Sequence, residues 1–249
     1  MSRTLRLAST LLLGIAAAAW CVPARALRPY DGTDAAVAPA SEVELEFGYF
    51  GYMREGPQRS LLAPAVVLNV GLENGAELVI EGRVRNRINP DLGLSGQSLE
   101  GAAVSLKQVH RIGILQDASG PSVASECGVL LPTQTGESYG ASCAGITSVR
   151  WYDITTHLNT ALARNRNQHG EVFAGVIVEG PLISNVRPVL ETYLMHDSAG
   201  ERVESALIGL LWPARDNLSF DIALRRARDH GNGITELRAG FTWTQPARH

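Results

Sequence analysis

The sequence predicts an all-β protein, an up-and-down antiparallel transmembrane β-barrel of about twelve strands. Three observations lead to this fold class. The chain starts with the residue pattern of an export signal. The rest of the chain contains repeated segments in which apolar and polar residues alternate, which is the pattern of strands and not of helices. Many of these segments reach the roughly 9 to 11 residues that a tilted strand needs to cross a bilayer.

The first 26 residues have the three regions of a secretory signal peptide. Arg3 and Arg6 precede an apolar run at positions 11–20, and an A-x-A pattern follows at positions 24–26. The apolar run is about half of the roughly 20 residues that a membrane-spanning helix needs. We therefore expect residues 1–26 to be removed on export.

The remaining chain is acidic. The full sequence has 22 basic and 25 acidic residues, and the signal region holds three of the basic ones and none of the acidic ones, which leaves 19 against 25. Because phosphate binding needs clustered positive charge, this balance argues against a nucleic-acid partner. Residues 27–40 are expected to form a flexible periplasmic leader, and residues 41–249 the barrel. Asp31 and Asp34 in the leader lack the further acids and the glycine of a calcium loop.

The strand pattern is clearest at its first occurrence, where three apolar side chains point one way and three glutamates point the other. These two sets are Val43, Leu45 and Phe47, and Glu42, Glu44 and Glu46. Segments of this kind recur along the chain, bounded by Gly, Asn, Asp and Pro turns. The strands are expected near 41–53, 60–71, 76–87, 99–116, 122–131, 141–149, 153–164, 171–179, 186–195, 203–212, 217–228 and 234–244.

The connections between these segments alternate in character. After odd-numbered strands they are longer and more polar, as in REGPQRS at 54–60 and RNRNQHG at 164–170. After even-numbered strands they are shorter, as in GLENG at 71–75. Long loops on one face and short turns on the other, with an even strand count, are typical of bacterial outer-membrane barrels. This arrangement predicts that both chain ends lie on the periplasmic side.

The two faces of each segment differ in polarity, as Leu224 beside Arg225 illustrates in the segment at 217–228. If the apolar face contacts lipid, the charged face lines the lumen. A soluble periplasmic barrel that carries a ligand needs the opposite arrangement. Tryptophans near strand ends favour lipid outside, because such aromatic residues sit at membrane interfaces. These residues are Trp151, Trp212 and Trp243.

The polar residues on the inferred lumen side form a mixed-charge wall. Such a wall would line a watery passage for small solutes, or its arginines and glutamates would pair across strands and fill the bore. Eight strands leave room only for side chains and sixteen leave a channel, so twelve strands leave both alternatives open. The predicted lumen-lining residues are Glu44, Glu46, Glu77, Glu81, Arg83, His157, Glu179, Arg187, Glu191, Asp221, Arg225, Glu236 and Arg238.

Two further features concern chemistry. A lipid-modifying enzyme would need a nucleophile and a base within hydrogen-bonding reach, and we interpret His157 instead as a lumen histidine with satisfied hydrogen bonds. Cys127 and Cys143 lie eight residues on either side of Thr135, so a hairpin centred there would place them opposite each other. A shift of one residue would separate them, so a disulfide and free thiols both stay open.

Several stretches resemble the outer-membrane β-barrel family labelled as meta-pathway phenol-degradation or transporter-like proteins. The resemblance implies a barrel fold and an outer-membrane location, and it brings no catalytic motif. One departure is that residues 245–249 (QPARH) follow Trp243, whereas such barrels usually end on an aromatic residue. The similar stretches are LRPYDGTDA (27–35), GYFGYMREG (48–56), LLAPAVVLNVGL (61–72), ELVIEGR (77–83), LSFDIALRRAR (218–228) and TELRAGFTW (235–243).

Together these observations predict a non-enzymatic passive channel or uptake protein for small molecules in the cell outer membrane. The aromatic nature of the solute comes only from the family label. Expected partners are outer-membrane lipid, the barrel-assembly machinery and a small solute, and no metal or other cofactor is expected. The alternatives are a lumen-filled structural barrel, an outer-membrane lipid-modifying enzyme and a soluble periplasmic ligand-binding barrel.

Overall fold

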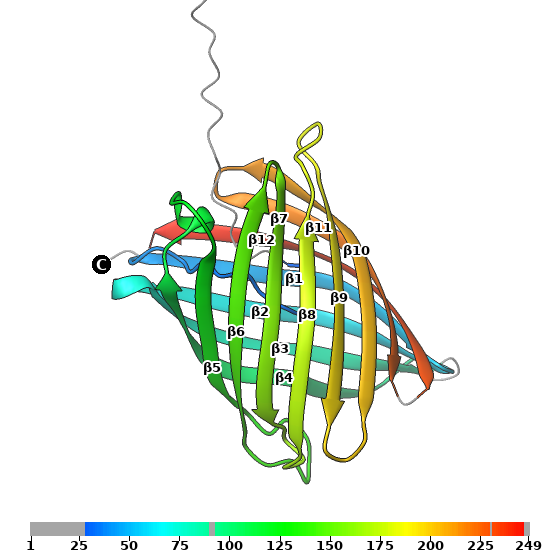
Figure 1. The fold of residues 1–249 in the computed structure, drawn as a ribbon. Coiled ribbons are helices and arrows are strands. Elements are labelled where there is room, and N and C mark those ends of the chain that lie inside the picture. The colour runs from blue at the N-terminus through cyan, green and yellow to red at the C-terminus, as the bar shows by residue number, and fades with distance from the viewer. Residues whose placement is uncertain (1–27, 90–92, 230, 247–249) are drawn as a thin grey trace, which may run out of the picture.

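The protein is a closed β-barrel of twelve antiparallel strands in a computed structural model that describes residues 28–89, 93–229 and 231–246 (Figure 1). Each strand pairs with its neighbours in sequence, and β12 closes the barrel on β1. This confirms the predicted fold class. The strands are β1 Glu42–Glu55, β2 Gln58–Leu72, β3 Ala76–Asn89, β4 Gly93–Arg111, β5 Ser122–Leu130, β6 Gly140–Trp151, β7 Ile154–Arg164, β8 Gly170–Glu179, β9 Arg187–Asp197, β10 Arg202–Arg215, β11 Leu218–Asp229 and β12 Asn232–Pro246.

The largest difference from the expected strand bounds concerns β4. This strand begins at Gly93 and ends at Arg111, and the residues after it form a short 3-10 turn, η2, at Ile114–Gln116. The hydroxyl of Ser122 accepts the backbone N–H of Leu115, and Asp117 takes a left-handed conformation with φ 58°. A second 3-10 turn, η1, at Glu73–Gly75 joins β2 to β3. No helix among the described residues is long and apolar enough to cross a membrane.

The expected contrast in loop length is wrong. β1 and β2 stay paired up to Glu55 and Gln58, so a turn at residues 56–57 replaces the expected long loop. The connection from β4 to β5 after an even-numbered strand covers residues 112–121, which is longer than that turn. The physical reason is that polar side chains do not stop a ladder, because backbone groups gain hydrogen bonds wherever two strands stay in register.

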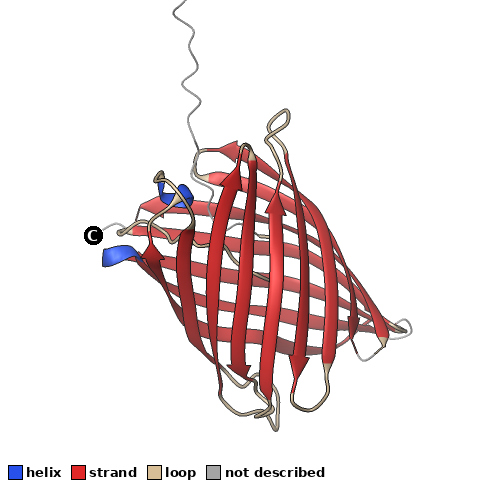
Figure 2. Cartoon of the chain, viewed as in Figure 1, coloured by secondary structure: helices blue, strands red, loops and turns tan. Residues whose placement is uncertain are grey.

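Both ends of the barrel sequence lie at the same end of the barrel, where Glu42 pairs with Pro246. An even number of strands that alternate in direction requires this arrangement. The connections after even-numbered strands lie at this end and those after odd-numbered strands at the other. Figure 2 shows the strands as a tilted, closed wall.

The wall is apolar outside and polar inside. Large apolar side chains such as Ile208, Ile222 and Leu224 are 42–60% exposed on the outer face. The neighbouring positions on β11, Asp221 and Arg225, are buried. This polarity is the reverse of a soluble barrel with an apolar interior. It follows the alternation in the sequence, because successive side chains of a strand point to opposite faces.

The chain from Tyr30 to Ala38, ahead of β1, lies inside the barrel, whereas we expected a flexible periplasmic leader. Ala35 and Ala38 are buried, and backbone and side-chain groups from Tyr30 to Ala38 bond to the inner wall. We call residues 28–40 the N-terminal segment. Its composition gave no sign of this position, because most of its hydrogen bonds to the wall come from backbone groups.

Candidate functional site: the plugged lumen

Side chains of the wall bind the backbone of the N-terminal segment. The carboxylate of Glu191 accepts the N–H of Asp31 at 2.9 Å and that of Gly32 at 2.7 Å. The side chain of Asn159 accepts the N–H of Thr33 at 3.0 Å and donates to the carbonyl of Thr33 at 2.8 Å. Because a buried peptide group without a partner is costly, these wall residues make it possible for an extended chain to cross the lumen.

The later part of the segment closes the end of the lumen at which β1 starts. The hydroxyl of Ser148 accepts the N–H of Ala35 at 3.0 Å, and Gln116 donates to the carbonyl of Ala35 at 3.0 Å. Ala35 also packs with Leu115 and Ile146 in a small apolar cluster. Ala35 is thus in contact both with the wall and with the β4–β5 connection.

The charged side chains of the segment pair with opposite charges on the wall. Asp31 contacts Arg238 at 2.8 Å and Arg225 at 3.0 Å. Asp34 lies 3.5 Å from Lys107, which is 2% exposed. Burial would raise the pKa of Asp31, but the guanidinium groups of Arg238 and Arg225 hold that pKa below its usual value. Asp31 is therefore a carboxylate at neutral pH.

The structure places the predicted lumen residues on the inner side of the wall. Many of them contact the N-terminal segment: Glu77, Glu179, Glu191, Asp221, Arg225 and Arg238. The others bond to wall residues or line an inner cavity: Glu44 to Thr244, Glu46 to Asn69, Glu81 at the cavities, Arg83 to Glu100, His157 to Ser148, Arg187 to Glu179, and Glu236 to Arg225 and Arg238.

Sequence analysis did not single out Lys107, Gln116 or Ser148, which bind the segment. It expected Asn159 to point inward but gave it no role. The position of Asn159 two residues after the inward His157 gave a usable signal. Lys107 is the sole lysine of the chain, yet a single cation on a predicted strand carries no information about its partner. Ser148 could not be singled out, because serine occurs on both faces of barrel strands.

A serine, a histidine and a glutamate meet in the lumen. Ser148 Oγ lies 2.8 Å from His157 Nδ1, and His157 Nε2 lies 3.8 Å from Glu179 Oε1. Ser148 is fully buried beneath Ala35, and Glu179 is already bonded to Arg187 at 2.5 Å. In this arrangement Ser148 and Glu179 bond to the N-terminal segment, and the serine hydroxyl is buried. His157 Nε2 is buried without a hydrogen bond to the described residues, so the expectation of a fully satisfied histidine is wrong for this nitrogen.

A second serine–histidine contact lies on the outer face. His110 Nε2 is 2.6 Å from Ser125 Oγ, and Ser125 lies between the inward residues Ala124 and Glu126. The chain also has a Gly-x-Ser-x-Gly stretch at residues 136–140. That stretch lies in the β5–β6 loop, and not in the strand–turn–helix context in which such a serine acts as a nucleophile.

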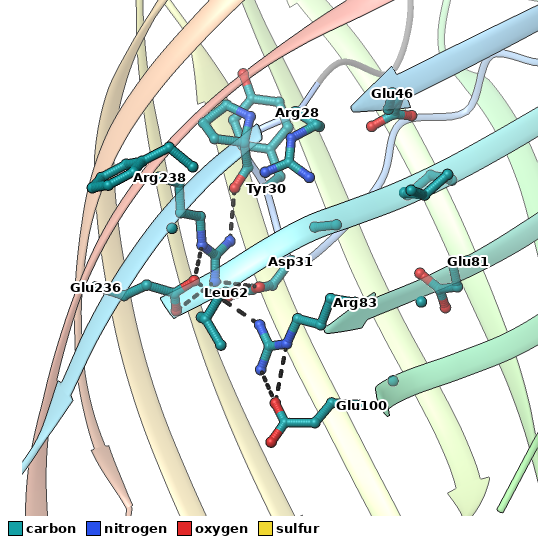
Figure 3. A pocket seen from close by; sticks show the side chains of 18 residues that line it. Arg28, Tyr30, Asp31, Glu46, Leu62, Glu81, Arg83, Glu100, Glu236 and Arg238 are labelled. Atoms are coloured by element: carbon teal, nitrogen blue, oxygen red, sulfur yellow. Dashed lines mark hydrogen bonds and ion pairs between the residues drawn. The ribbon is translucent and has the colours of Figure 1, made fainter. Parts of the chain in front are cut away.

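Two cavities remain inside the barrel around the segment. The larger, of about 550 Å³, is lined by Asp31, Glu81 and Phe173 among other residues. The smaller, of about 250 Å³, lies beside Asp31, Arg83 and Arg238 (Figure 3). The lumen therefore combines a chain that obstructs it with space that water or a small solute can occupy. No group of residues suited to a metal ion occurs in the described ranges.

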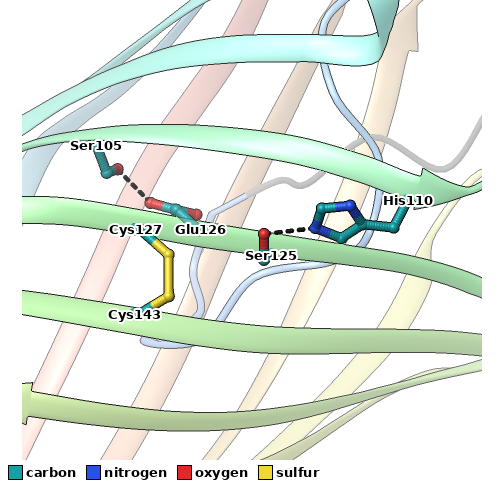
Figure 4. Close-up of a disulfide and its surroundings, with 6 residues drawn as sticks. All are labelled: Ser105, His110, Ser125, Glu126, Cys127 and Cys143. Carbon is teal, nitrogen blue, oxygen red and sulfur yellow. Dashed lines mark hydrogen bonds between the residues drawn. A yellow bond between two sulfur atoms is a disulfide. The ribbon is translucent and has the colours of Figure 1, made fainter.

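Cys127 and Cys143 are joined by a disulfide. Cys127 on β5 lies directly opposite Cys143 on β6, and a disulfide connects them (Figure 4). The register is the one in which the hairpin is centred on Thr135. Both cysteines are exposed on the outer face, so the bond belongs to the wall and not to the lumen.

Comparison with known proteins supports the fold. No protein-family model matches the sequence, and no curated protein matches it either. Among solved structures, a KdgM porin is similar with a TM-score of 0.52 and 11% identity, over 81% of this chain and 98% of that chain. The COG4313 outer membrane channel from Pseudomonas putida F1 is similar with a TM-score of 0.60 and 7% identity, over 87% of this chain and 100% of that one. In fold, the chain is thus similar to outer-membrane porins and channels.

Proposed function

We propose that the protein is a passive channel of the outer membrane whose N-terminal segment obstructs the lumen. The observation that carries this proposal is a charged bore with internal cavities inside a wall with an apolar outer face. Porins and channels share the fold, and the apolar outer face suits lipid. The export signal predicted for residues 1–26 would direct the chain to this location.

The contacts that hold the segment in the bore are mostly polar. Between Tyr30 and Ala38 it is held by hydrogen bonds and ion pairs, and its apolar contacts gather around Ala35. Hydrogen bonds exchange for bonds to water at a modest net cost, whereas buried ion pairs need another ion in place of the lost partner. We infer that the segment moves within the bore while the strands stay paired.

The passing solute belongs to the class of small molecules, because the cavities are about 250 and 550 Å³. The tilted rings of Phe173 and Tyr193 pack in the lumen with centroids 5.0 Å apart, which favours a solute with an apolar or aromatic body. The resemblance to proteins labelled as phenol-degradation or transporter-like stays a prediction, as do the barrel-assembly machinery and lipid as partners.

Single-channel conductance in planar bilayers tests the proposal. We expect the chain from residue 27 to show a low conductance, and a variant without residues 28–40 to show a conductance several times higher. A matched variant carries a glycine–serine segment of equal length at 28–40 and should behave like the deletion, because it fills the same contour length without the wall contacts. If neither variant conducts, the barrel is a closed structural element and the proposal is wrong.

The second candidate function is lipid hydrolysis, and the exposed contact between His110 and Ser125 is the observation that favours it. No acid is bonded to His110 among the described residues, so the histidine lacks an orienting partner. A fluorophosphonate probe in detergent micelles tests this candidate. Labelling that disappears in Ser125→Ala but persists in Ser148→Ala would support the enzyme, and no labelling would exclude this pair as a nucleophile and base.

A further inference from the structure

The carboxylate of Asp31 is bound between two guanidinium groups. One oxygen lies 2.8 Å from Arg238 Nη2 and the other lies 3.0 Å from Arg225 Nε. Figure 3 shows Asp31 in contact with Arg238 at the smaller cavity. Planar guanidinium groups are the protein groups best suited to carboxylates, since they offer several donors in a fixed arrangement.

The two arginines are held in place by the wall and do not depend on Asp31. Arg225 donates to the hydroxyl of Ser205 at 2.9 Å and to the hydroxyl of Tyr193. Arg238 donates to Glu236 at 2.7 and 3.1 Å, and these bonds remain when its bond to the carbonyl of Pro29 in the segment is lost. The same two guanidinium groups would therefore keep their positions after the N-terminal segment had left, as a preorganised site requires.

The charge balance of this cluster depends on Asp31. The wall supplies two cations, Arg225 and Arg238, and one anion bonded to both of them, Glu236. Asp31 supplies the second negative charge from the segment. Its departure removes the carboxylate that is bonded to both guanidinium groups, and buried cations that lose such a partner favour another anion in its place.

A solute can reach this cluster. Asp31 lines both inner cavities, and Arg238 lines the smaller one. The larger cavity is also lined by Phe173, whose ring packs at a tilt against Tyr193. Arg225 lies over the ring of Tyr193 at 5.6 Å. A carboxylate at the two arginines would thus place an attached apolar body beside aromatic rings.

We propose that Arg225 and Arg238 form a binding site for the carboxylate of a small, apolar organic acid, and that Asp31 occupies this site as a built-in competitor until the acid replaces it. This inference rests on the proposed channel function. Because Asp31 and the acid exclude each other, the acid favours the state in which the segment has left.

The other charges of the lumen restrict the solute further. On the wall of the larger cavity five acids outnumber two cations, Lys107 and Arg166; the acids are Glu46, Glu77, Glu81, Glu126 and Glu171. These acids oppose a second negative charge on the solute. The expected class is therefore a monocarboxylate with an uncharged body.

Benzoate is a suitable probe and benzamide is its uncharged control. In planar bilayers at constant ionic strength, replacing chloride with benzoate should raise the open fraction of the wild-type channel by about fivefold or more, in the range of typical coupling between sites. Benzamide should have no effect. Asp31→Asn should open the channel without benzoate and remove the response to it.

Asp34→Asn is the matched control, because it weakens the segment at Lys107 and leaves the two arginines unchanged. It should raise the open fraction and keep the response to benzoate. In the channel without residues 28–40, benzoate should still bind at the two arginines, and Arg225→Gln should abolish that binding.

Two results would overturn the inference. One is an equal effect of benzoate and benzamide on the wild-type channel. The other is a benzoate response that persists in Asp31→Asn. If the variant without residues 28–40 conducts while either result is found, only this inference fails. If that variant does not conduct, the proposed function fails as well.

Discussion

Ser148 holds the N-terminal segment through a single buried hydrogen bond, in which its hydroxyl accepts the N–H of Ala35. Ser148→Ala removes the acceptor and leaves the amide of Ala35 without a partner, at a cost of about 1–3 kcal/mol. We expect faster hydrogen exchange at Ala35 and a higher open fraction in planar bilayers. Thermal unfolding of the barrel should change little, since the strand ladder is intact. Unchanged exchange at Ala35 would contradict the role given to Ser148.

Glu137 provides a pH-dependent contact in the β5–β6 loop. Its carboxylate accepts the N–H of Thr133 at 2.7 Å, the hydroxyl of Thr133 at 3.0 Å and the N–H of Gln134 at 3.1 Å. The bond from the N–H of Thr133 is the largest cause that lowers the pKa of Glu137. A lowered pKa in the folded state means that the contact stabilises the loop above the usual glutamate value of about 4.3 and is lost as the pH falls below it.

The measurement for Glu137 is the NMR shift of the Thr133 and Gln134 amides between pH 7 and pH 2. We expect both to titrate together with a midpoint below about 4.3. Glu137→Gln should show no such titration. A midpoint above that value would mean that the loop contacts do not form in solution.

At the residue scale, alternation in the sequence was sufficient to assign side chains to the inner face. Glu236 and Arg238, two positions apart on one strand, both lie in the lumen as expected. The partners of the N-terminal segment could not be predicted. Asp31 meets Arg238 across 207 positions, and no local pattern encodes a contact of that range.

Among the elements, the β5–β6 hairpin carries the covalent link. The disulfide between Cys127 and Cys143 closes a sequence separation of 16 residues, and such links typically stabilise by about 2–4 kcal/mol through the unfolded chain. Changing both cysteines to serine should lower the free energy of unfolding of the barrel in lipid vesicles by this amount, seen as a lower urea midpoint. Reduction of the wild-type protein should have the same effect. Equal midpoints for all forms would show that the strand ladder alone fixes this hairpin.

The strands themselves could be predicted closely, and their connections could not. The expected segment at 171–179 corresponds to β8 at Gly170–Glu179. By contrast, the polar residues Arg54 and Arg59 were assigned to a loop, and they pair with each other across β1 and β2. Polarity marks which residues meet water, whereas the ladder ends where geometry no longer allows pairing.

For the whole molecule, the outer face should behave as a lipid-facing surface. Leu224 lies near the middle of β11 and is 42% exposed. Leu224→Arg should destabilise the barrel in vesicles by about 2–4 kcal/mol, as charges do at the bilayer midplane. Leu224→Ala is the control for lost apolar area. Equal unfolding free energies for the two variants would mean that this face does not contact lipid.

The fold class and the outward apolar face could be read from the sequence because both depend on a period of two. Whether the bore is filled could not be read from the sequence, since the strand number alone permits an open or a filled bore. In this structure the N-terminal segment occupies the bore, and its sequence has neither a strand nor a helix pattern.

The position of the N-terminal segment also constrains the order of biogenesis. The segment is synthesised before every strand, yet its ion pairs reach Asp221, Arg225 and Arg238 on the last two strands. These ion pairs can form only once β11 and β12 are in place, whereas the bonds to Asn159 and Glu191 on earlier strands do not need them. The anchoring of the segment is therefore completed by the strands that are synthesised last.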